Sequence, residues 1–346
     1  MSAEPPTALA VPRAAEVAPA VWRIRTSMPG HSFGVVNSYL LETGEGAVLI
    51  DTPWGTPSVI AELEEGIAQS GHRPEDVRTV LLTHYHEDHS GAAGWFQRQY
   101  GARVGMHELD AANLRSRFGG GEDFARALEE WLELTGPDEQ SREYARAQFR
   151  ELSSYAFPVE IDLPLQDGQR LDPGGRALRV VHTPGHTPGS ASFLDEGTRT
   201  LFTGDHVFDR RRTNAVARPY SVARPIASYW ESSERLLALR PALVLPGHDD
   251  PIEDLAARMD RLREVRDAKL AEVRALARGG TAWELAQRMT RRTPWDALDG
   301  NAKLAATGEV LAYLYEARDE GSVVADDRRP ARWTASDAGT RRGGGR

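Results

Sequence analysis

The stretch Thr83-His84-Tyr85-His86-Glu87-Asp88-His89-Ser90-Gly91 carries the strongest signal in this chain. It places three histidines and an aspartate within six residues, directly after the apolar segment Val80-Leu81-Leu82. A strand that ends in such a cluster delivers its side chains to the edge of a sheet, where the backbone holds them rigidly. Neutral imidazole suits zinc, and a carboxylate oxygen suits a second, harder metal position. The alternative is a solvated polar loop that happens to be rich in histidine.

Three later segments repeat this arrangement, in which an apolar run leads through Gly or Pro to a side chain that can bind metal. The run 177–181 precedes His182 and His186, the run 201–204 precedes Asp205 and His206, and the run 243–247 precedes His248. Because the pattern recurs at independent strand ends, coincidence is a poor explanation for it.

With these motifs the chain resembles the metallo-β-lactamase superfamily, whose His-x-His-x-Asp-His motif matches the first stretch. The resemblance implies one metal held by His84, His86 and His186, and another held by Asp88, His89 and His248. Asp205 would bridge the two metals, as in the glyoxalase II-like and lactonase-like branches. Asp51 matches the family's first motif and would support the ligands without binding metal. The matching elements occur in the family's order between residues 51 and 248.

The chemistry of two metals explains this ligand set. Two metals that share a hydroxide lower the pKa of water from about 15.7 toward neutrality, which makes a nucleophile available near pH 7. Asp88 would bind metal and orient this hydroxide, so it is the predicted catalytic residue. The chain contains no cysteine, which excludes cysteine catalysis and a disulfide framework. We therefore predict two zinc ions per chain, with manganese or iron as alternatives.

The remaining histidines are His31, His72, His107, His182 and His206. His182 and His206 lie beside the later motifs and are predicted to support the ligands, because metal-bound side chains need oriented partners. His72 and His107 have polar neighbours in the sequence and are predicted to lie on the surface. His31 precedes an early strand that borders the site in the family, and it is a candidate substrate contact.

Length and composition fit one sizeable catalytic domain and a small second one. Of the 346 residues, 40% are hydrophobic and 27% are charged. The first twenty residues lack the basic start and apolar middle of a signal peptide, and no stretch reaches transmembrane length. We expect a cytoplasmic protein without a membrane partner.

The alternation of apolar runs and helical patterns predicts an α/β fold. We expect residues 19–252 to form the catalytic domain, an αββα sandwich of two mixed sheets with helices outside. Within it, residues 119–157 are predicted to form a helical cap. Trp131, Phe149 and Tyr155 of this segment are candidate pocket residues. The alternative is that these helices only cover the sheet.

The C-terminal region is predicted to form a small helical winged-helix domain over residues 253–334, similar to that appended to many such hydrolases. Residues 1–18 and 335–346 are expected to be disordered. From Ala256 onward there are 18 Lys or Arg against 14 Asp or Glu, whereas the rest of the chain is strongly acidic. Because a polyanion needs a basic surface, nucleic-acid binding is not expected.

The combined pattern predicts a dinuclear metal-dependent hydrolase in which a metal-bridging hydroxide attacks an ester-like carbonyl. The expected substrate is a small or carrier-bound acyl compound, either a thioester of coenzyme A or of an acyl carrier protein, or a lactone. A metal-dependent endoribonuclease or phosphodiesterase and a mononuclear iron oxygenase on the same fold remain alternatives. A homodimer is also left open.

Overall fold

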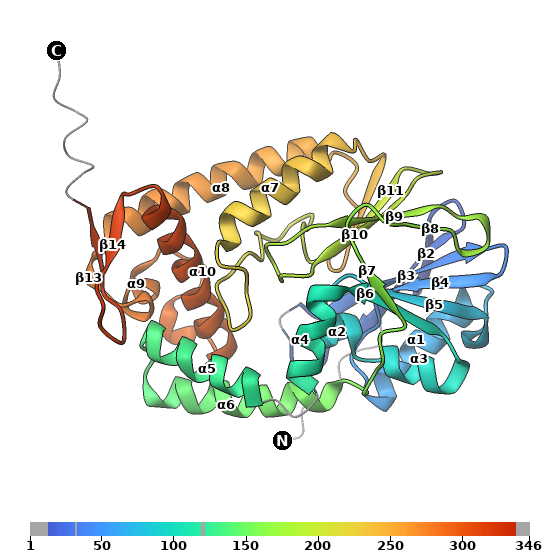
Figure 1. Ribbon diagram of the computed structural model, residues 1–346, viewed down its shortest axis with the longest axis horizontal. Coiled ribbons are helices and arrows are strands. Elements are labelled where there is room, and N and C mark those ends of the chain that lie inside the picture. The colour runs from blue at the N-terminus through green and yellow to red at the C-terminus, as the bar shows by residue number, and fades with distance from the viewer. Residues whose placement is uncertain (1–12, 32, 119–121, 337–346) are drawn as a thin grey trace, which may run out of the picture.

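The computed structural model describes residues 13–31, 33–118 and 122–336. Two β-sheets pack face to face, with helices on both outer sides, and a C-terminal helical unit extends from one end (Figure 1). In the part of the chain that the structure describes, no helix is both long enough and apolar enough to cross a membrane.

The first sheet has the strand order β1-β2-β3-β4-β5-β6-β7. Its strands β1 to β4 are antiparallel, and β4 to β7 run parallel. The strands are β1 (Ala14–Ala18), β2 (Val21–Ser27), β3 (Val35–Thr43), β4 (Gly46–Ile50), β5 (Val77–Leu82), β6 (Arg103–His107) and β7 (Leu163–Leu165).

The second sheet has the order β12-β11-β10-β9-β8. Only β11 and β12 are parallel, and the other pairs are antiparallel. The strands are β8 (Arg170–Leu171), β9 (Leu178–His182), β10 (Ala191–Asp195), β11 (Thr200–Gly204) and β12 (Leu243–Pro246).

Neighbouring residues of one strand pack into different hydrophobic cores, one on each face of the sheet. In β5, Leu81 faces the second sheet, while Val80 and Leu82 pack beneath the outer helices. In β10, Phe193 joins the core between the sheets and Leu194 joins the core on the other side. Successive side chains of a strand point to opposite faces, so a run of apolar residues serves two cores at once.

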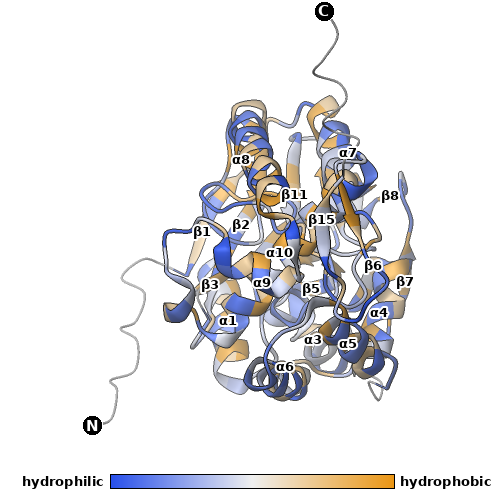
Figure 2. Ribbon diagram, turned by 90° about the vertical axis from the view of Figure 1, so that its left-hand side faces the viewer, coloured by the Kyte–Doolittle hydropathy of each residue, from blue (hydrophilic) through white to orange (hydrophobic). Residues whose placement is uncertain are grey.

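Helices cover the outer faces of both sheets. The helices α1, α3 and α4 cover the first sheet, and α7 and α8 cover the second. Hydrophobic and hydrophilic residues are mixed along outer helices such as α6 and α8 (Figure 2), as expected for helices with one buried face. The helices up to α8 are α1 (Pro57–Gln69), α2 (Glu87–Ser90), α3 (Ala93–Tyr100), α4 (Glu108–Phe118), α5 (Glu122–Thr135), α6 (Glu139–Leu152), α7 (Pro225–Ala238) and α8 (Leu255–Leu276).

The C-terminal unit combines the end of α8 with two further helices and a small sheet of order β13-β15-β14. One continuous hydrophobic cluster joins this unit to α5, α7 and the second sheet. The unit therefore packs against α5, α7 and the second sheet through a shared hydrophobic core. Its remaining elements are β13 (Arg278–Gly280), α9 (Ala282–Arg288), α10 (Gly300–Asp319), β14 (Val323–Ala325) and β15 (Trp333–Ala335).

The prediction of disorder over residues 1–18 is wrong for its last part, since Ala14–Ala18 form the edge strand β1. Composition alone misses this strand because backbone pairing with β2 and an anchoring arginine stabilise it. The Arg13 guanidinium bonds Glu62 and Glu65 on α1. Residues 1–12, most of the tail predicted at 335–346 and the first three residues of the predicted cap, 119–121, lie outside the described residues.

Candidate metal centre

The topology brings the predicted site residues to one edge of the sandwich. Asp51 follows β4 and His84 follows the parallel neighbour β5, so both lie at the carboxyl ends of adjacent strands. Asp205 and His248 follow the parallel pair β11 and β12 in the same way. His186 lies in the loop between β9 and β10. The two sheets thus present their ligand-bearing ends to each other.

All seven predicted metal ligands come together in the structure. Their nitrogen and oxygen atoms form three groups, within each of which every atom lies within 4.8 Å of the others. These groups are His84, His86 and His186; His84, His89 and Asp205; and Asp88, His89 and His248. The first and third groups coincide with the two metal positions that the resemblance implies. The assignment of each residue as a ligand stays a prediction.

Asp205 lies between the two predicted metal positions. Its Oδ1 is 3.1 Å from His89 Nε2 and 3.5 Å from His248 Nε2. Its Oδ2 is 3.6 Å from His186 Nε2. One carboxylate therefore directs one oxygen toward each group, which is the arrangement that a bridging ligand requires.

The outer nitrogen of each of four histidines is held by a hydrogen bond, so the inner nitrogen faces the cluster. His84 Nδ1 lies 3.0 Å from Thr83 Oγ1, and His89 Nδ1 lies 2.8 Å from Asp51 Oδ2. The Nδ1 atoms of His186 and His248 each lie 2.8 Å from a backbone carbonyl, that of Asn214 for His186 and that of Val35 for His248. Metal-binding histidines are commonly oriented by such partners, which also select the tautomer. His86 instead directs Nδ1 inward, 3.0 Å from the Nε2 atoms of both His84 and His186.

Asp51, which the resemblance implies as a supporting residue, bonds Thr83 next to the cluster and His89 within it. Its carboxylate accepts hydrogen bonds of 2.7 Å from both the backbone N–H and the hydroxyl of Thr83, and it also accepts one from His89. Its backbone lies in the left-handed region, with a φ of 59°. Such a conformation costs of order 1–3 kcal/mol for a residue other than glycine and persists where its surroundings enforce it.

The chemistry of the cluster fits a metal cation. His89 Nε2, Asp205 Oδ1 and His248 Nε2 are buried and have no hydrogen-bond partner in the described structure. Burial alone would lower the pKa of His89, but the carboxylates of Asp205, Asp88 and Asp51 raise this pKa well above its usual value. Buried polar atoms without partners are costly, so the cluster attracts positive charge that a bound cation supplies.

Burial holds the pKa of His84 well below its usual value, and the neighbouring imidazoles lower it further. The ring is therefore neutral near pH 7, which is the protonation state that binds metal. Burial alone would raise the pKa of Asp88, but His89 and His248 hold it below its usual range. Asp88 is thus a carboxylate, and 17% of its side chain is exposed, so it can reach solvent and substrate.

An aromatic wall leads away from this cluster. The ring of Phe33 lies 4.4 Å from His248 and 4.9 Å from His31, measured between ring centres. The Trp54 ring follows at 6.3 Å from His31, and the Tyr155 ring at 4.8 Å from Trp54. Two of the predicted pocket residues, His31 and Tyr155, therefore belong to one chain of aromatic contacts that begins at the predicted ligand His248.

Two other pocket candidates occupy a different place. Trp131 is buried in the core shared with the C-terminal unit, and its indole N–H donates to the Ala217 carbonyl at 2.7 Å. Phe149 packs against the same core and stacks on Phe124. A substrate contact for these two residues stays a prediction, and their described contacts are with the protein interior.

The predicted supporting histidines have other partners than the ligands. His206 lies 3.0 Å from Ser233 Oγ through Nε2 and stacks on Tyr229. His182 bonds the Pro188 carbonyl at 2.7 Å and stacks on His107. The prediction that His107 lies on the surface is wrong, because the ring is buried in this stack at the end of β6.

Several residues around the predicted ligands were not predicted from the sequence. Thr83, Asn214 and the Val35 carbonyl orient histidines, and Phe33 and Trp54 form the wall. Thr83 could have been found, because it lies next to the motif. The others come from distant segments and carry no local signal.

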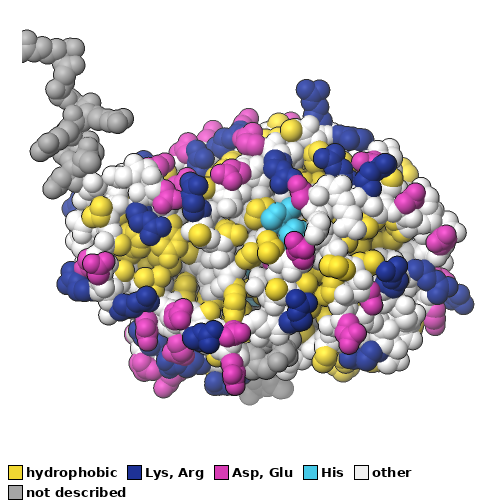
Figure 3. All heavy atoms as spheres, in the orientation of Figure 1, with side chains coloured by type: hydrophobic (Ala, Val, Ile, Leu, Met, Phe, Trp, Pro, Cys, Tyr) yellow, Lys and Arg dark blue, Asp and Glu magenta, His cyan; other side chains and the backbone are white. Residues whose placement is uncertain are grey.

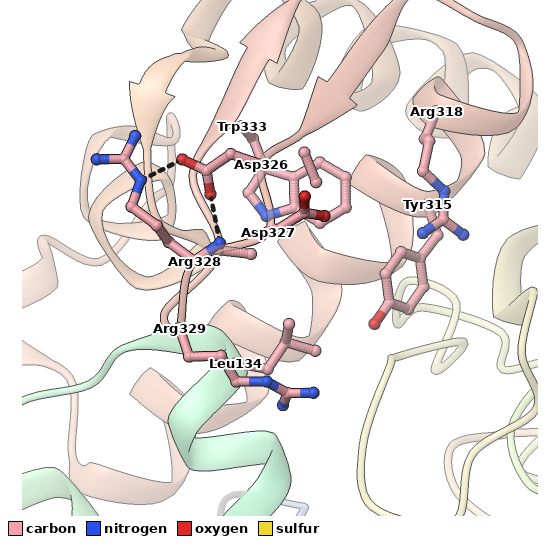
Figure 4. A pocket seen from close by; sticks show the side chains of 10 residues that line it. Leu134, Tyr315, Arg318, Asp326, Asp327, Arg328, Arg329 and Trp333 are labelled. Atoms are coloured by element: carbon pink, nitrogen blue, oxygen red, sulfur yellow. Dashed lines mark hydrogen bonds and ion pairs between the residues drawn. The ribbon is translucent and has the colours of Figure 1, made fainter.

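A separate hollow of about 270 Å³ lies on the C-terminal unit. It is lined by Leu134, Tyr315, Trp333 and a group of charged side chains from the loop between β14 and β15 (Figure 4). The Asp326 carboxylate in this hollow is already paired with Arg328. The hollow contains none of the seven predicted ligands and is distinct from the candidate metal centre.

Comparison with known proteins identifies the family. The metallo-beta-lactamase superfamily model matches residues 31–248, a span that holds every predicted ligand. The chain belongs to this superfamily, and the resemblance predicted from its motifs is confirmed at this level.

Related proteins carry two kinds of name. Lactamase-like protein adaB from Aspergillus niger is 29% identical over 266 residues, which are 77% of this chain and 66% of that protein. The human protein named acyl-coenzyme A thioesterase MBLAC2 is 33% identical over 221 residues, which are 61% of this chain and 72% of that protein. The chain spans slightly less than two thirds of the length of the adaB relative.

Two crystal structures share the overall architecture. A metallo-beta-lactamase family protein from Thermus thermophilus superposes with a TM-score of 0.80 at 31% identity, covering 92% of this chain and 100% of its own. A beta-lactamase domain protein from Burkholderia ambifaria gives a TM-score of 0.80 at 27% identity and covers 96% of both chains. This coverage extends beyond residue 248, so the C-terminal unit is part of the shared fold.

We predict two transition-metal ions per chain, because two of the three groups match the two implied metal positions and Asp205 lies between them. Elemental analysis of protein supplemented with zinc should give about two equivalents, since such sites bind zinc readily. A value well below one equivalent would contradict a dinuclear centre.

Replacing Asp88 with alanine should reduce turnover by about 10³-fold or more while leaving the fold intact, because it removes a predicted metal ligand and the carboxylate predicted to orient the reacting water. Asp205→Ala should lower metal content as well as rate. Asp250→Ala provides the control, since Asp250 pairs with Arg23 and Arg210 outside the cluster. Near-native turnover of Asp88→Ala would remove this residue from the mechanism.

Proposed function

We propose that this protein is a dinuclear metal-dependent hydrolase of thioesters, acting on an acyl group carried by coenzyme A or by an acyl carrier protein. The aromatic wall beside the ligand cluster carries this proposal. Its half-buried members Phe33 and Tyr155 would contact an acyl chain next to the polar groups that would act on its carbonyl. Pockets that bind small molecules combine such apolar walls with a few orienting polar groups.

The residues of the cluster have separable tasks in this reaction. His84, His86 and His186 would hold one metal, and Asp88, His89 and His248 the other. When bound, the two metals supply a water of lowered pKa and stabilise the negative charge that develops on the carbonyl oxygen and the departing thiolate. The Asp88 carboxylate orients that water and accepts its proton.

The wall residues determine which acyl groups fit. Trp54 is almost fully buried, so the ring is fixed by its contacts and not free to move aside. The Arg211 guanidinium lies over the Phe33 ring, 4.3 Å from its centre, and helps to hold it. A rigid aromatic wall favours long or aromatic acyl groups over acetyl, because more apolar area leaves water on binding.

The name of the human relative supports a thioester substrate. That protein is named an acyl-coenzyme A thioesterase, and the match to it extends over most of its length. A lactone presents a similar carbonyl and is the competing substrate class. The glyoxalase II-like branch, with its thiolate leaving group, is the proposed place of this chain within the superfamily.

We further propose that residues 253–334 form a winged-helix-like domain. The order helix, strand, helix, helix, strand, strand along α8, β13, α9, α10, β14 and β15 supports it. This order is the observation that keeps an endoribonuclease in consideration. On the face drawn in Figure 3, however, Lys and Arg side chains are scattered among acidic ones. Interleaved charges of this kind are a poor surface for a polyanion.

A screen of zinc-loaded protein against acyl-CoAs, lactones and single-stranded RNA tests the proposal. Thioester cleavage, measured by the release of free thiol, should be the fastest reaction and should disappear in Asp88→Ala. If lactones were opened faster than acyl-CoAs are cleaved, the proposed substrate class would be lactones and not thioesters. Salt-dependent binding of the RNA together with its cleavage would instead support the nuclease alternative.

Trp54→Ala should weaken the use of long or aromatic acyl groups by about 10-fold or more in kcat/KM relative to acetyl, since a buried aromatic contact is worth about 1.5–3 kcal/mol. Trp22→Ala is the matched control, because Trp22 packs against His72 outside the wall. An unchanged ratio of rates across an acyl series in Trp54→Ala would contradict a pocket at this wall.

A further inference from the structure

Asp110 is a fully buried carboxylate near the start of α4. It is not among the metal-ligand clusters, and no motif in the sequence singles it out. Burying a carboxylate costs free energy unless hydrogen bonds satisfy it. The residues that satisfy this carboxylate show what it does.

The two carboxylate oxygens bond two different loops. Oδ2 accepts a hydrogen bond of 3.2 Å from the backbone N–H of Tyr85 and one of 2.6 Å from the Thr187 hydroxyl. Oδ1 accepts one of 2.6 Å from the backbone N–H of Gly189. Asn113, one turn along α4, approaches Oδ1 at 3.5 Å.

The bonded residues are interleaved with predicted metal ligands. Tyr85 separates His84 from His86 in the loop after β5 of the first sheet. Thr187 directly follows His186 in the loop between β9 and β10 of the second sheet. A single buried side chain therefore ties together the two loops whose histidines form one cluster.

Gly189 on the second loop packs tightly against Asp110. A Cβ added to Gly189 would lie 2.3 Å from the Asp110 backbone nitrogen and 2.7 Å from Oδ1. Glycine is required here for close approach, and this approach allows the short bond to Oδ1. Ser190 reinforces the loop, since its Oγ lies 2.6 Å from Thr187 Oγ1 and accepts a bond from the Thr187 backbone N–H.

The cost of burying the Asp110 carboxylate agrees with a role in holding the two loops together. Burial raises the pKa of Asp110 to about 6, although Thr187, Gly189 and Tyr85 all donate to the carboxylate and oppose the rise. An apolar residue at this position would avoid that desolvation. It would, however, leave the N–H groups of two ligand loops buried and unpaired.

We propose that Asp110 is a positioning residue that fixes the separation of the two loops and thereby builds the metal position formed by His84, His86 and His186. At the position formed by Asp88, His89 and His248, the Asp51 carboxylate and the Val35 carbonyl orient the two histidines instead, so this position does not depend on Asp110. The inference rests on the metal centre and not on the nature of the substrate.

Zinc affinity measured by competition with a chelator tests this without any substrate, so it does not depend on thioester hydrolysis. The wild-type chain and Asp110→Ala are titrated for both zinc equivalents. We expect Asp110→Ala to weaken one equivalent by about 10–100-fold, the usual effect of losing a residue that orients metal ligands, and to leave the other near its wild-type affinity.

Asp195→Ala is the matched control for general destabilisation. Asp195 is also a buried carboxylate, but it bonds Arg176 and the backbone N–H of Gly197, at the far end of β10 from the Thr187 loop. This variant should lower the thermal midpoint of unfolding and keep both zinc affinities. A second pair, Thr187→Val and Thr187→Ser, removes and then restores the hydroxyl, so only Thr187→Val should weaken the same equivalent.

Equal weakening of both equivalents in Asp110→Ala would overturn the proposal, because the carboxylate would then act on the whole fold. Unchanged zinc affinities in both Asp110→Ala and Thr187→Val would overturn it as well. If Asp110→Ala does not fold, the Thr187 pair decides by itself. Selective loss in Thr187→Val with recovery in Thr187→Ser supports the positioning role, and identical affinities in the two variants reject it.

Discussion

The burial of imidazoles and carboxylates against one another is the constraint on which this structure depends. His84, His89 and His248 are each at most 1% exposed, and Asp205 is 5% exposed. Taking such groups out of water costs several kcal/mol each unless they find partners. Within the described structure, several of their inner atoms have no hydrogen-bond partner. The cluster is therefore an arrangement that a bound cation completes.

Orientation of these side chains comes from the outer partners and not from the ligands themselves. Each sheet supplies part of the framework: the strand ends of β4 and β5 carry Asp51 and Thr83, and the β9–β10 loop is tied across the gap by Asp110. The second sheet alone could not hold His186 beside His86. Contacts between the sheets make a single centre from two halves of the chain, and that explains why a face-to-face sandwich suits this chemistry.

The C-terminal unit reaches the site through one loop. Trp131 on α5 donates to the Ala217 carbonyl, and the Ala217 backbone N–H donates to Gly308 on α10. The same loop supplies Asn214, whose carbonyl orients His186 and whose side chain bonds Asp205 at 3.3 Å. The helices of the predicted cap and the C-terminal unit thus stabilise the backbone behind the ligands, a structural task that accounts for the buried position of Trp131.

The sequence by itself indicated the histidines and aspartates that the structure brings together, the strand-end pattern and the family, because side chains that can bind metal are of few types and here follow apolar strands at short spacings. Only the tertiary structure decided the role of Asp110, the aromatic wall from Phe33 to Tyr155 and the edge strand Ala14–Ala18. These depend on contacts between segments far apart in the chain, and such contacts leave no periodicity or spacing in the sequence.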